Sequence, residues 1–576
     1  MSALMLSMRA TLPNMYHISS RQNLNINKVS TESLLGNKMT STTTTVFCRH
    51  ENLQIPKHIS SGQNGKISAT VDTESVSING QLSSKRHDGL GIIEFFGGKK
   101  LLITGATGFL AKVLVEKILR TLPEVDKIFL LIKAKNEEAA TERLMNEIVN
   151  TELFKCLREK HGTLFEKFIL SKLVPVVGNM SETNIGIEAD VANRIAREVD
   201  LIINSAATTT FDERPDIALD INTRGAARIV NFAKNCENLK LYVHVSTAYA
   251  CRQSEGEIIE ESLGKGHYVA SNADISEAQH KHIHGMDIEA EIKLVSEIKD
   301  SFEKNEIDQK LEDFGMRRAQ KYGWPNTYSF TKAMGEMVVE DTKGEMPVII
   351  LRPSVITSTS EEPFSGWIEG NRMMDPFFLW YGKGKLPGFY SSPDTIADMV
   401  PADIVVNSTL AAIAKHGCEK ATPGDDHVYH ITSSVAHPLM ARDLLDLAYQ
   451  HFSLSPCFDR KGNPIQISAF KFFTSIQDLL SDMQKTNGST EISPRQELIR
   501  RKTEEHLKYL ANLYQPYTFY TGRFDNSNVE ELMKCLSEEE RQVFGFDVGS
   551  IDWKDYVINV HFPGIRKHIM KERMLK

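Results

Sequence analysis

Tyr328 and Lys332 lie four residues apart in the stretch TYSFTKAMGE, residues 327 to 336. On a helix this spacing places both side chains on one face, one turn apart. A phenol has a pKa near ~10, and a neighbouring cation lowers it. The pair therefore predicts a proton donor and the cation that tunes it, with Tyr328 protonating a carbonyl oxygen while a hydride reaches the carbonyl carbon.

Two hydroxyl residues end a predicted strand upstream of this pair. The run LKLYVHVST, residues 239 to 247, is apolar up to Ser246 and Thr247. Ligands of doubly wound sheets bind at the carboxyl ends of the strands. We expect Thr247 to hydrogen-bond the same substrate oxygen as Tyr328, and Lys332 also to hold the ribose beside a nicotinamide.

A glycine-rich turn near residue 105 predicts a dinucleotide site. KKLLIT (residues 99 to 104) resembles a short strand, and FLAKVLVEKILRTL (residues 109 to 122) has apolar residues at helical spacing. Between them, Gly105 permits a tight turn, Gly108 lets the backbone approach a pyrophosphate, and Ala111 lets the helix pack closely. The helix N-terminus adds N–H groups and positive potential. A purely structural turn is the alternative.

The end of the second strand indicates which dinucleotide binds. An NAD-specific site would place Asp or Glu there, whereas this chain has Lys133 and then Lys135. Cations suit the 2′-phosphate of NADPH, which we therefore expect as the cofactor. Surface lysines that merely end a strand are the alternative.

The elements that must position these residues read as an α/β fold with a doubly wound parallel sheet. Nearly continuous apolar runs, typical of parallel strands covered on both faces, alternate with helical segments. The strand-like runs are KKLLIT, KIFLLIK, LVPVVG, VDLIINSAA, LKLYVHVST and PVIILRPS. A charged stretch at about 273 to 323 predicts a solvated helix, with a lid over the site as the alternative. After about residue 440 helical sequence dominates, which predicts a smaller, mainly helical C-terminal domain.

The composition of the chain narrows the classes of partner that the protein is expected to bind. The chain has 576 residues and a formal net charge of -8, which argues against nucleic acid or an anionic membrane surface and favours a metabolite or a protein carrier. No apolar run reaches the ~18 residues of a membrane helix. Seven cysteines without CxxC pairs predict reduced thiols, and His280, His282 and His284 have no matching ligand cluster, so we expect no metal.

The first sixty residues have the composition of an organelle transit peptide. They are rich in Ser, Thr and Asn and carry several cations. Glu32 and Glu51 are the acids among them. A merely disordered tail is the alternative. The expected organisation is a transit peptide (1–60), a linker (61–95), an NADPH-binding reductase domain (96–440) and a C-terminal domain (441–576).

Several longer motifs resemble one family. The chain is similar to the extended short-chain dehydrogenase/reductases and, among them, to the fatty acyl reductases of the plant male-sterility type. The motifs are TGATGFLAK (104–112), NSAATTTFDERPDIALDINTRG (204–225), VSTAYA (245–250), YSFTKAMGE (328–336), RPSVI (352–356), VPAD (400–403), YQPYTFYTGRFDNSN (514–528) and FGFDVGSIDWKDYVINVHFPGIRKH (544–568). The resemblance covers residue 90 to the end and implies a Rossmann-type fold with the family's own C-terminal domain.

The resemblance also implies a function. It implies reduction of a long-chain acyl thioester, on coenzyme A or acyl carrier protein, to a primary alcohol with two NADPH, in plastids. Direct hydride attack is the simpler route, because none of these motifs includes a cysteine that could form a covalent thioester. The implied catalytic residues are Thr247, Tyr328 and Lys332. The implied cofactor contacts are Thr104, Gly105, Thr107, Gly108, Phe109, Leu110, Lys133, Ala206, Ala207, Tyr328, Lys332 and Val355.

Two other interpretations stay open. A nucleotide-sugar epimerase or dehydratase of the same superfamily would share every cofactor motif, although the C-terminal motifs argue against it. A non-catalytic scaffold or sensor that binds the cofactor would be expected to lack Tyr328 or Lys332. The apolar segment GWIEGNRMMDPFFLWYGKGKLPGF, residues 366 to 389, predicts either a tunnel for an alkyl chain or ordinary core.

Overall fold

The computed structural model describes residues 89–252, 255–263, 286–303, 306–418, 427–486 and 494–572. The predicted transit peptide, the predicted linker up to residue 88 and the histidines His280, His282 and His284 lie outside these residues. All described residues belong to one compact unit of the chain. No helix among them is both long and apolar enough to cross a membrane.

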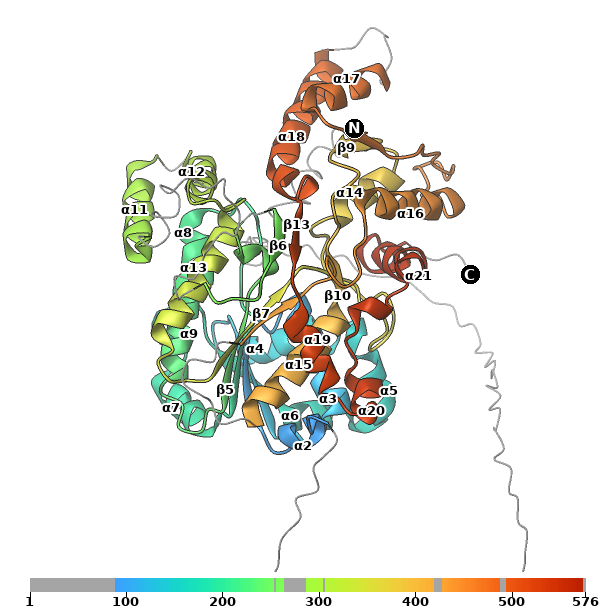
Figure 1. Cartoon of the computed structure of the whole chain (residues 1–576). Helices are drawn as coiled ribbons and strands as arrows, with labels where there is room; N and C mark the ends of the chain where they lie inside the picture. Colours follow the sequence, from blue (N-terminus) through green and yellow to red (C-terminus); the bar gives the residue numbers. More distant parts are fainter. Residues whose placement is uncertain are drawn as a thin grey trace, which may run out of the picture. The chain divides into compact units, whose positions relative to one another are not determined.

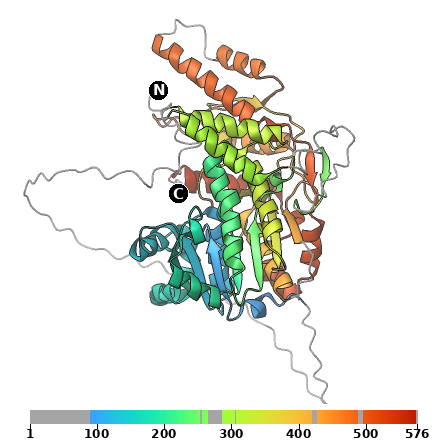
Figure 2. The same cartoon turned by 90° about the vertical axis from the view of Figure 1, so that its left-hand side faces the viewer.

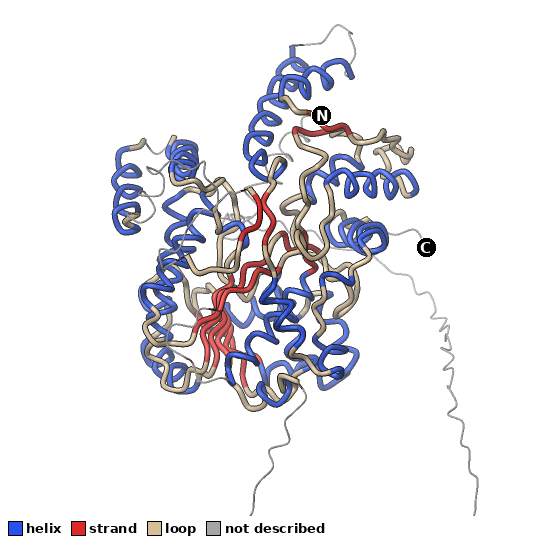
Figure 3. The backbone as a smooth tube through the Cα atoms, viewed as in Figure 1, coloured by secondary structure: helices blue, strands red, loops and turns tan. Residues whose placement is uncertain are grey.

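A seven-stranded parallel sheet forms the centre of this unit, seen as the red fan of strands in Figure 3. The strand order is β11-β7-β5-β4-β1-β2-β3, so the chain runs outward from β1 to one edge and then crosses over to build the other side. The strands are β1 (Lys100–Thr104), β2 (Lys127–Ile132), β3 (Leu173–Val177), β4 (Leu201–Asn204), β5 (Leu241–Val245), β7 (Val348–Pro353) and β11 (His427–Ile431). The crossover between β1 and β4 is the topological switch point where such sheets bind ligands.

Helices cover both faces of the sheet (Figures 1 and 2). Alternate residues of a strand point to opposite faces, and Leu102 packs into a different cluster from Leu101 and Ile103. One face carries α7 (Ala189–Glu198), α9 (Gly225–Ala233) and α13 (Thr327–Thr342). The other carries α2 (Ile92–Phe96), α3 (Phe109–Thr121), α5 (Lys155–His161), α6 (Phe165–Lys172) and α15 (Ala402–Cys418). Apolar burial on both faces explains why the strands are nearly continuous hydrophobic runs.

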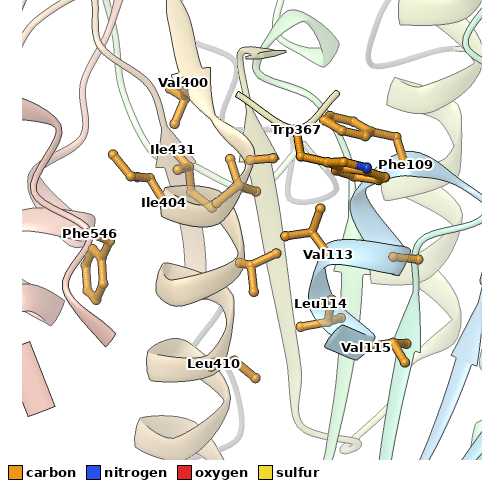
Figure 4. Packing of buried hydrophobic residues seen from close by; sticks show 14 of the residues in the cluster. Phe109, Val113, Leu114, Val115, Trp367, Val400, Ile404, Leu410, Ile431 and Phe546 are labelled. Atoms are coloured by element: carbon orange, nitrogen blue, oxygen red, sulfur yellow. The ribbon is translucent and has the colours of Figure 1, made fainter. Parts of the chain in front are cut away.

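Helix α3 packs closely against α15, and its first residue, Phe109, packs against Trp367. Figure 4 shows Val113 and Leu114 of α3 facing Ile404 and its neighbours, with Trp367 above them. The indole of Trp367 stacks on the ring of Phe109 at 5.3 Å between centroids. Buried aromatic pairs contribute about 0.5–1.5 kcal/mol beyond the area that they bury. The first residue of α3 is therefore held by the segment between β8 (Val355–Thr357) and α14 (Asp375–Gly382).

Further elements extend from the sheet. The remaining α-helices of four or more residues are α4 (Glu137–Arg143), α8 (Pro215–Ala218), α11 (Ile288–Ser301), α12 (Ile307–Lys321), α14 (Asp375–Gly382), α16 (Ala441–Leu454), α17 (Ile476–Thr486), α18 (Pro494–Thr518), α19 (Ser527–Lys534) and α20 (Glu538–Phe544). Three two-stranded parallel pairs join β6 (Gly256–Ile258) to β13 (Gly522–Phe524), β8 (Val355–Thr357) to β10 (Met399–Pro401), and β9 (Gly388–Tyr390) to β12 (Lys471–Phe473).

The structure confirms the predicted doubly wound sheet and the six predicted strands. The sequence analysis missed β11, whose residues HVYHI carry two polar histidines and so lack a continuous apolar run. The charged stretch at 273 to 323 forms α11 and α12 over its described residues. The division at residue 440 stays a prediction, and β13 pairs with β6 of the preceding region.

Candidate functional site

The glycine turn leaves no room for a side chain at its first position. Gly105 has φ of +71°, and a Cβ there would lie 2.8 Å from the Cα and N atoms of Ala206. Gly108 occupies the N-cap of α3 without a side-chain cap, and the first turn of that helix holds no acid. Open N–H groups at a helix start attract an anion. The backbone therefore fits a pyrophosphate approaching between β1 and β4.

Side chains at the ends of β1 and β4 support this turn. The hydroxyl of Thr104 donates to Oδ1 of Asn204 at 2.7 Å and accepts from the N–H of Ala206 at 3.1 Å. The amide of Asn204 contacts Nδ1 of His244 on β5 at 3.3 Å. Both hydrogen bonds of Thr104 hold the loop that carries Ala206 and Ala207 against β1, where the resemblance places cofactor contacts.

Helix α13 carries the predicted proton donor. Its N-cap is Asn326, whose Oδ1 accepts from the N–H of Ser329 at 2.9 Å. Tyr328 follows two residues later, and its side chain hydrogen-bonds that of Thr247, which lies just beyond the end of β5. The Thr247 hydroxyl also accepts from the N–H of Tyr249, at 3.4 Å. The structure thus brings Tyr328 and Thr247 together at the carboxyl end of the sheet.

The pKa of Tyr328 is not lowered as the sequence analysis expected. Burial raises it to about 12, and the hydrogen bond from Thr247 acts in the opposite direction. The ammonium of Lys332 donates to the carbonyl oxygen of Val245 at 2.7 Å. A phenol with this pKa stays protonated at neutral pH, which is the state that a proton donor in a reduction requires.

Lys332 is buried next to the end of β5. Its side chain is 2% exposed, and burial lowers its pKa to about 8, while the nearby carboxylate of Glu336 acts to raise it. One of its three N–H donors is used by Val245. The others remain for a ligand such as a ribose hydroxyl, which is the role expected from the sequence.

Buried hydroxyls also mark this edge of the sheet. The Oγ atoms of Ser246, after β5, and Ser354, after β7, are buried and have no hydrogen-bond partner within the described parts of the chain. Buried polar groups normally find partners, so unpaired hydroxyls at a ligand-binding edge fit a polar molecule that binds there. This observation and the glycine turn show that the residues fit a dinucleotide.

The sequence analysis missed the aromatic residues around Tyr328. The ring of Phe211 lies 6.3 Å from Tyr328, 4.9 Å from Tyr517 and 5.6 Å from Tyr514 between centroids. The Tyr517 hydroxyl accepts from Nδ2 of Asn326 at 2.6 Å. Because Tyr514 and Tyr517 belong to α18, the C-terminal motif YQPYTFY reaches the catalytic helix. Its aromatic content was the signal that could have located it.

A pocket that is open to solvent adjoins the glycine turn through Phe109. It is lined by Phe109, Val355, Ile356, Thr357, Ile368, Glu369, Gly370, Arg372, Met373, Met374, Asp375 and His561. Seven of these residues come from the segment 366 to 389 that was expected to line an alkyl tunnel or core. The pocket brings together Phe109 and Val355, two predicted cofactor contacts that are far apart in the sequence.

The end of β2 carries more positive charge than the sequence indicated. Lys133 and Lys135 are both exposed there. Arg143, at the end of α4, donates to the carbonyl oxygen of Lys133 at 2.6 Å and is also paired with Glu147. Arg143 lies ten residues beyond Lys133, which is why strand-end reasoning did not single it out.

Among the described residues no group of three or more His, Cys, Asp or Glu side chains is arranged to hold a metal ion. No disulfide joins the cysteines of the described ranges. Thr107 lies in the glycine turn and Leu110 in the first turn of α3, both half-buried, and their contacts with a cofactor stay a prediction.

Comparison with known proteins adds family evidence. Two models, both described as male sterility protein, match residues 103–409 and 494–572. A chloroplastic fatty acyl-CoA reductase 2 of Arabidopsis thaliana is 51% identical over 500 residues, covering 84% of this chain and 80% of that protein. An alcohol-forming fatty acyl-CoA reductase of Simmondsia chinensis is 37% identical, covering 83% of this chain and 99% of that protein.

Solved structures with this fold are more distant. The terminal R domain of the myxalamid PKS-NRPS pathway aligns with a TM-score of 0.51 at 16% identity, covering 81% of this chain and 91% of that one. The reductase domain of a non-ribosomal peptide synthetase from Mycobacterium tuberculosis gives 0.51 at 18% identity, covering 84% and 96%. At such identities the match shows a shared fold.

Proposed function

Because the chain belongs to the male sterility family, which includes the fatty acyl-CoA reductases that it matches, we propose that it reduces long-chain acyl thioesters to primary alcohols with NADPH. The single observation that carries this proposal is the convergence of Tyr328 and Thr247 at the sheet edge beside the glycine turn. Nothing in this geometry favours a nucleotide sugar as the substrate. A non-catalytic scaffold would be expected to lack Tyr328 or Lys332, and this chain has both.

The residues of the chain supply binding and proton transfer. When bound, NADPH supplies the hydride for each of two reductions. Tyr328 protonates the oxygen of the thioester carbonyl, and the Thr247 hydroxyl holds that oxygen. The resulting hemithioacetal returns its hydroxyl proton to Tyr328 as it expels a thiolate, which takes a proton from solvent. The aldehyde is then reduced at the same phenol, which solvent reprotonates. One thioester, two NADPH and two protons thus give one alcohol, one thiol and two NADP⁺.

The preference for NADPH over NADH is part of this proposal. Lys133, Lys135 and Arg143 are cations at the end of β2, where the 2′-position of the adenosine ribose is expected. A guanidinium and ammonium groups both suit a phosphate dianion. We propose that these three side chains read the 2′-phosphate, although Arg143 shares its charge with Glu147.

We propose that the acyl group lies along the aromatic residues that extend from Tyr328. Phe211 connects Tyr328 to Tyr514, and Tyr514 contacts Phe377 of α14 at 4.8 Å between centroids. Phe377 in turn packs against Phe389 at 4.7 Å. An apolar chain gains about 0.8 kcal/mol per buried CH₂, so a continuous apolar path suits a long acyl group.

We further propose import into plastids, with acyl carrier protein as the donor. The basis is the composition of residues 1–60, which lie outside the described structure, and the relative named as chloroplastic. An acidic carrier needs a basic docking patch. The cations near the C-terminus are candidates for such a patch, but Arg566 pairs with Glu572 and Lys567 with Glu152. Lys571 is exposed, and Arg573 lies outside the described residues.

Product analysis tests the central proposal. Purified protein is incubated with NADPH and acyl thioesters of increasing chain length, and the lipid products are identified by mass spectrometry. We expect primary alcohols and two NADPH oxidised per thiol released. A steady ratio of one with accumulating aldehyde would show that the second reduction does not occur here.

The subcellular location of the protein and the carrier of its acyl substrate need separate measurements. A fluorescent fusion with and without residues 1–60 reports import, and kcat/KM for one acyl chain on each carrier reports the donor. Cytosolic fluorescence of the full-length fusion would contradict import. A clear preference for the coenzyme A thioester would contradict the carrier assignment alone.

A further inference from the structure

A buried ion pair lies directly behind Lys332. Glu336 follows Lys332 by one helical turn on the same face of α13, and its side chain is fully buried. Arg352, the fifth residue of β7, is also fully buried and binds Glu336 through two parallel hydrogen bonds, Nε to Oε1 at 3.1 Å and Nη2 to Oε2 at 2.6 Å. Nothing in the proposed reaction uses either residue.

Neutral imidazoles complete the surroundings. Nη1 of Arg352 lies 3.1 Å from Nε2 of His430, whose Nδ1 lies 2.9 Å from the carbonyl oxygen of Asp525. Nδ1 therefore carries the proton and Nε2 accepts from Arg352. Burial holds the pKa of His430 well below its usual value, and burial with the charges of Lys332 and Arg352 does the same for His244. The charged side chains of this part of the core include Lys332, Glu336 and Arg352. Glu260, which accepts from the N–H of His430 at 2.6 Å, also interacts with the charge of Arg352, and burial raises the pKa of Glu260 to about 8.

We propose that Glu336 and Arg352 are positioning residues that set the pH range over which Lys332 is charged. The proposal rests on the role of Lys332 in the proposed function. The Glu336 carboxylate holds the ammonium in its charged form, and Arg352 both fixes that carboxylate and limits its effect. Glu336 lies one turn from Lys332 on α13, as does Tyr328, and His244 on β5 feels the charges of both Lys332 and Arg352. Arg352 on β7 is in turn surrounded by Glu336, Cys251 and His430, with Glu260 close enough to feel its charge.

Removal of the Glu336 charge and removal of the Arg352 charge must shift the pH at which Lys332 loses its proton in opposite directions. Without the Glu336 charge, Lys332 faces the cation of Arg352 alone, so it loses its proton at a lower pH. Without Arg352, the carboxylate is unneutralised and Lys332 keeps its proton to a higher pH. Loss of packing or local unfolding would not produce shifts in opposite directions, which separates this role from a purely structural one.

The test measures NADPH binding against pH by the fluorescence of the cofactor, together with kcat/KM for a free aldehyde. Wild-type protein should lose affinity as pH rises through about 8, the pKa of Lys332, and Lys332→Arg should abolish this loss. We expect Glu336→Gln to move the midpoint down by about one pH unit and Arg352→Gln to move it up by a similar amount. Glu336→Asp and Arg352→Lys, which conserve charge, should leave it in place.

A charge-balanced double variant serves as the control for misfolding of the single variants. Glu336→Gln combined with Arg352→Gln removes both charges and should restore a midpoint near that of wild type, even if a single variant does not fold. Midpoints that move in the same direction in both single variants would overturn the proposal. So would a wild-type midpoint that Lys332→Arg does not remove, or a double variant displaced by a full unit.

The result is independent of the acyl substrate. NADPH binding requires no thioester, so a protein that binds NADPH with the expected shifts but reduces no acyl thioester would contradict the proposed function alone. A protein that forms alcohol without these shifts would contradict the inference alone.

Discussion

The ammonium of Lys332 donates a hydrogen bond to the carbonyl oxygen of Val245 at 2.7 Å. This bond joins α13 to the last residue of β5, two residues before Thr247. The end of β5 therefore orients Lys332 by a direct hydrogen bond, and it orients Thr247 because Thr247 lies only two residues further along the chain. The relative position of Thr247 and Tyr328 depends on this contact, because Tyr328 lies one turn before Lys332 on the same helix.

Removal of the phenol hydroxyl should abolish most activity while leaving cofactor binding intact. Tyr328→Phe deletes the proton donor but keeps the ring beside Phe211. We expect kcat to fall by about 10²- to 10⁴-fold with an unchanged dissociation constant for NADPH. The exposed Tyr509→Phe, on α18, is the matched control and should be silent. A Tyr328→Phe enzyme with most of its activity would refute the assigned donor.

The lowered pKa of Lys332 predicts how stability depends on pH. Its pKa of about 8 in the folded protein lies below the value of 10.5 for an exposed lysine. The unfolded chain binds more protons between these values, so the contribution of Lys332 to stability rises with pH across that window. Relative to Lys332→Met, wild type should gain up to about 3 kcal/mol between pH 8 and pH 10.5.

Melting temperatures of both proteins without cofactor, measured across this range, check the sign. The melting temperature of wild type minus that of Lys332→Met should rise with pH. A difference that falls toward high pH would show that Lys332 is stabilised, not penalised, in its charged form.

The glycine turn predicts a steric effect at one position. Gly105→Ala places a Cβ against the backbone of Ala206, and Gly98→Ala is a matched control because Gly98 also has positive φ, +68°, but has nothing within 4 Å. Both variants carry the strain of a left-handed conformation. We expect only Gly105→Ala to weaken NADPH binding by about tenfold or more, measured by titration. Equal losses in both variants would attribute the effect to backbone strain.

Charge reversal at the end of β2 should erode the cofactor preference. Lys133→Asp turns attraction for a 2′-phosphate into repulsion, so the ratio of kcat/KM for NADPH to that for NADH should fall by about tenfold or more. Arg143→Ala should act in the same direction and Lys167→Asp, an exposed residue of α6, should have no effect. An unchanged ratio in Lys133→Asp would assign the phosphate to Lys135 or Arg143.

Truncation of the aromatic path should affect long substrates most. Tyr514→Ala removes contacts with both Phe211 and Phe377. We expect the KM of the variant to exceed that of wild type by a factor that grows with acyl chain length. We also expect free aldehyde to appear, because the intermediate is held less firmly after the first reduction. Leu498→Ala, exposed on the same helix, is the control. A uniform loss of activity at every chain length would place the acyl group elsewhere.

Local pattern alone determined six of the seven strands of the sheet, the glycine turn and the Tyr328–Lys332 pair. Continuous apolar runs specify parallel strands buried on both faces, and a helical period of about 3.6 fixes which side chains share a face. The family resemblance to the male sterility proteins was likewise carried by sequence motifs alone. These features depend on neighbours within one turn or one strand, so no long-range contact is needed to infer them.

Only the tertiary structure decided what surrounds the phenol. Lys332 lies on the same face as Tyr328, yet its ammonium is directed to Val245, and desolvation, which depends on the whole fold, raises the phenol pKa instead of lowering it. Tyr517 reaches Asn326 from 191 residues away, and Arg352 finds Glu336 across the boundary between strand and helix. Burial and long-range pairing are properties of the packed chain, because the spacing along the sequence does not state which distant side chains share a dry interior.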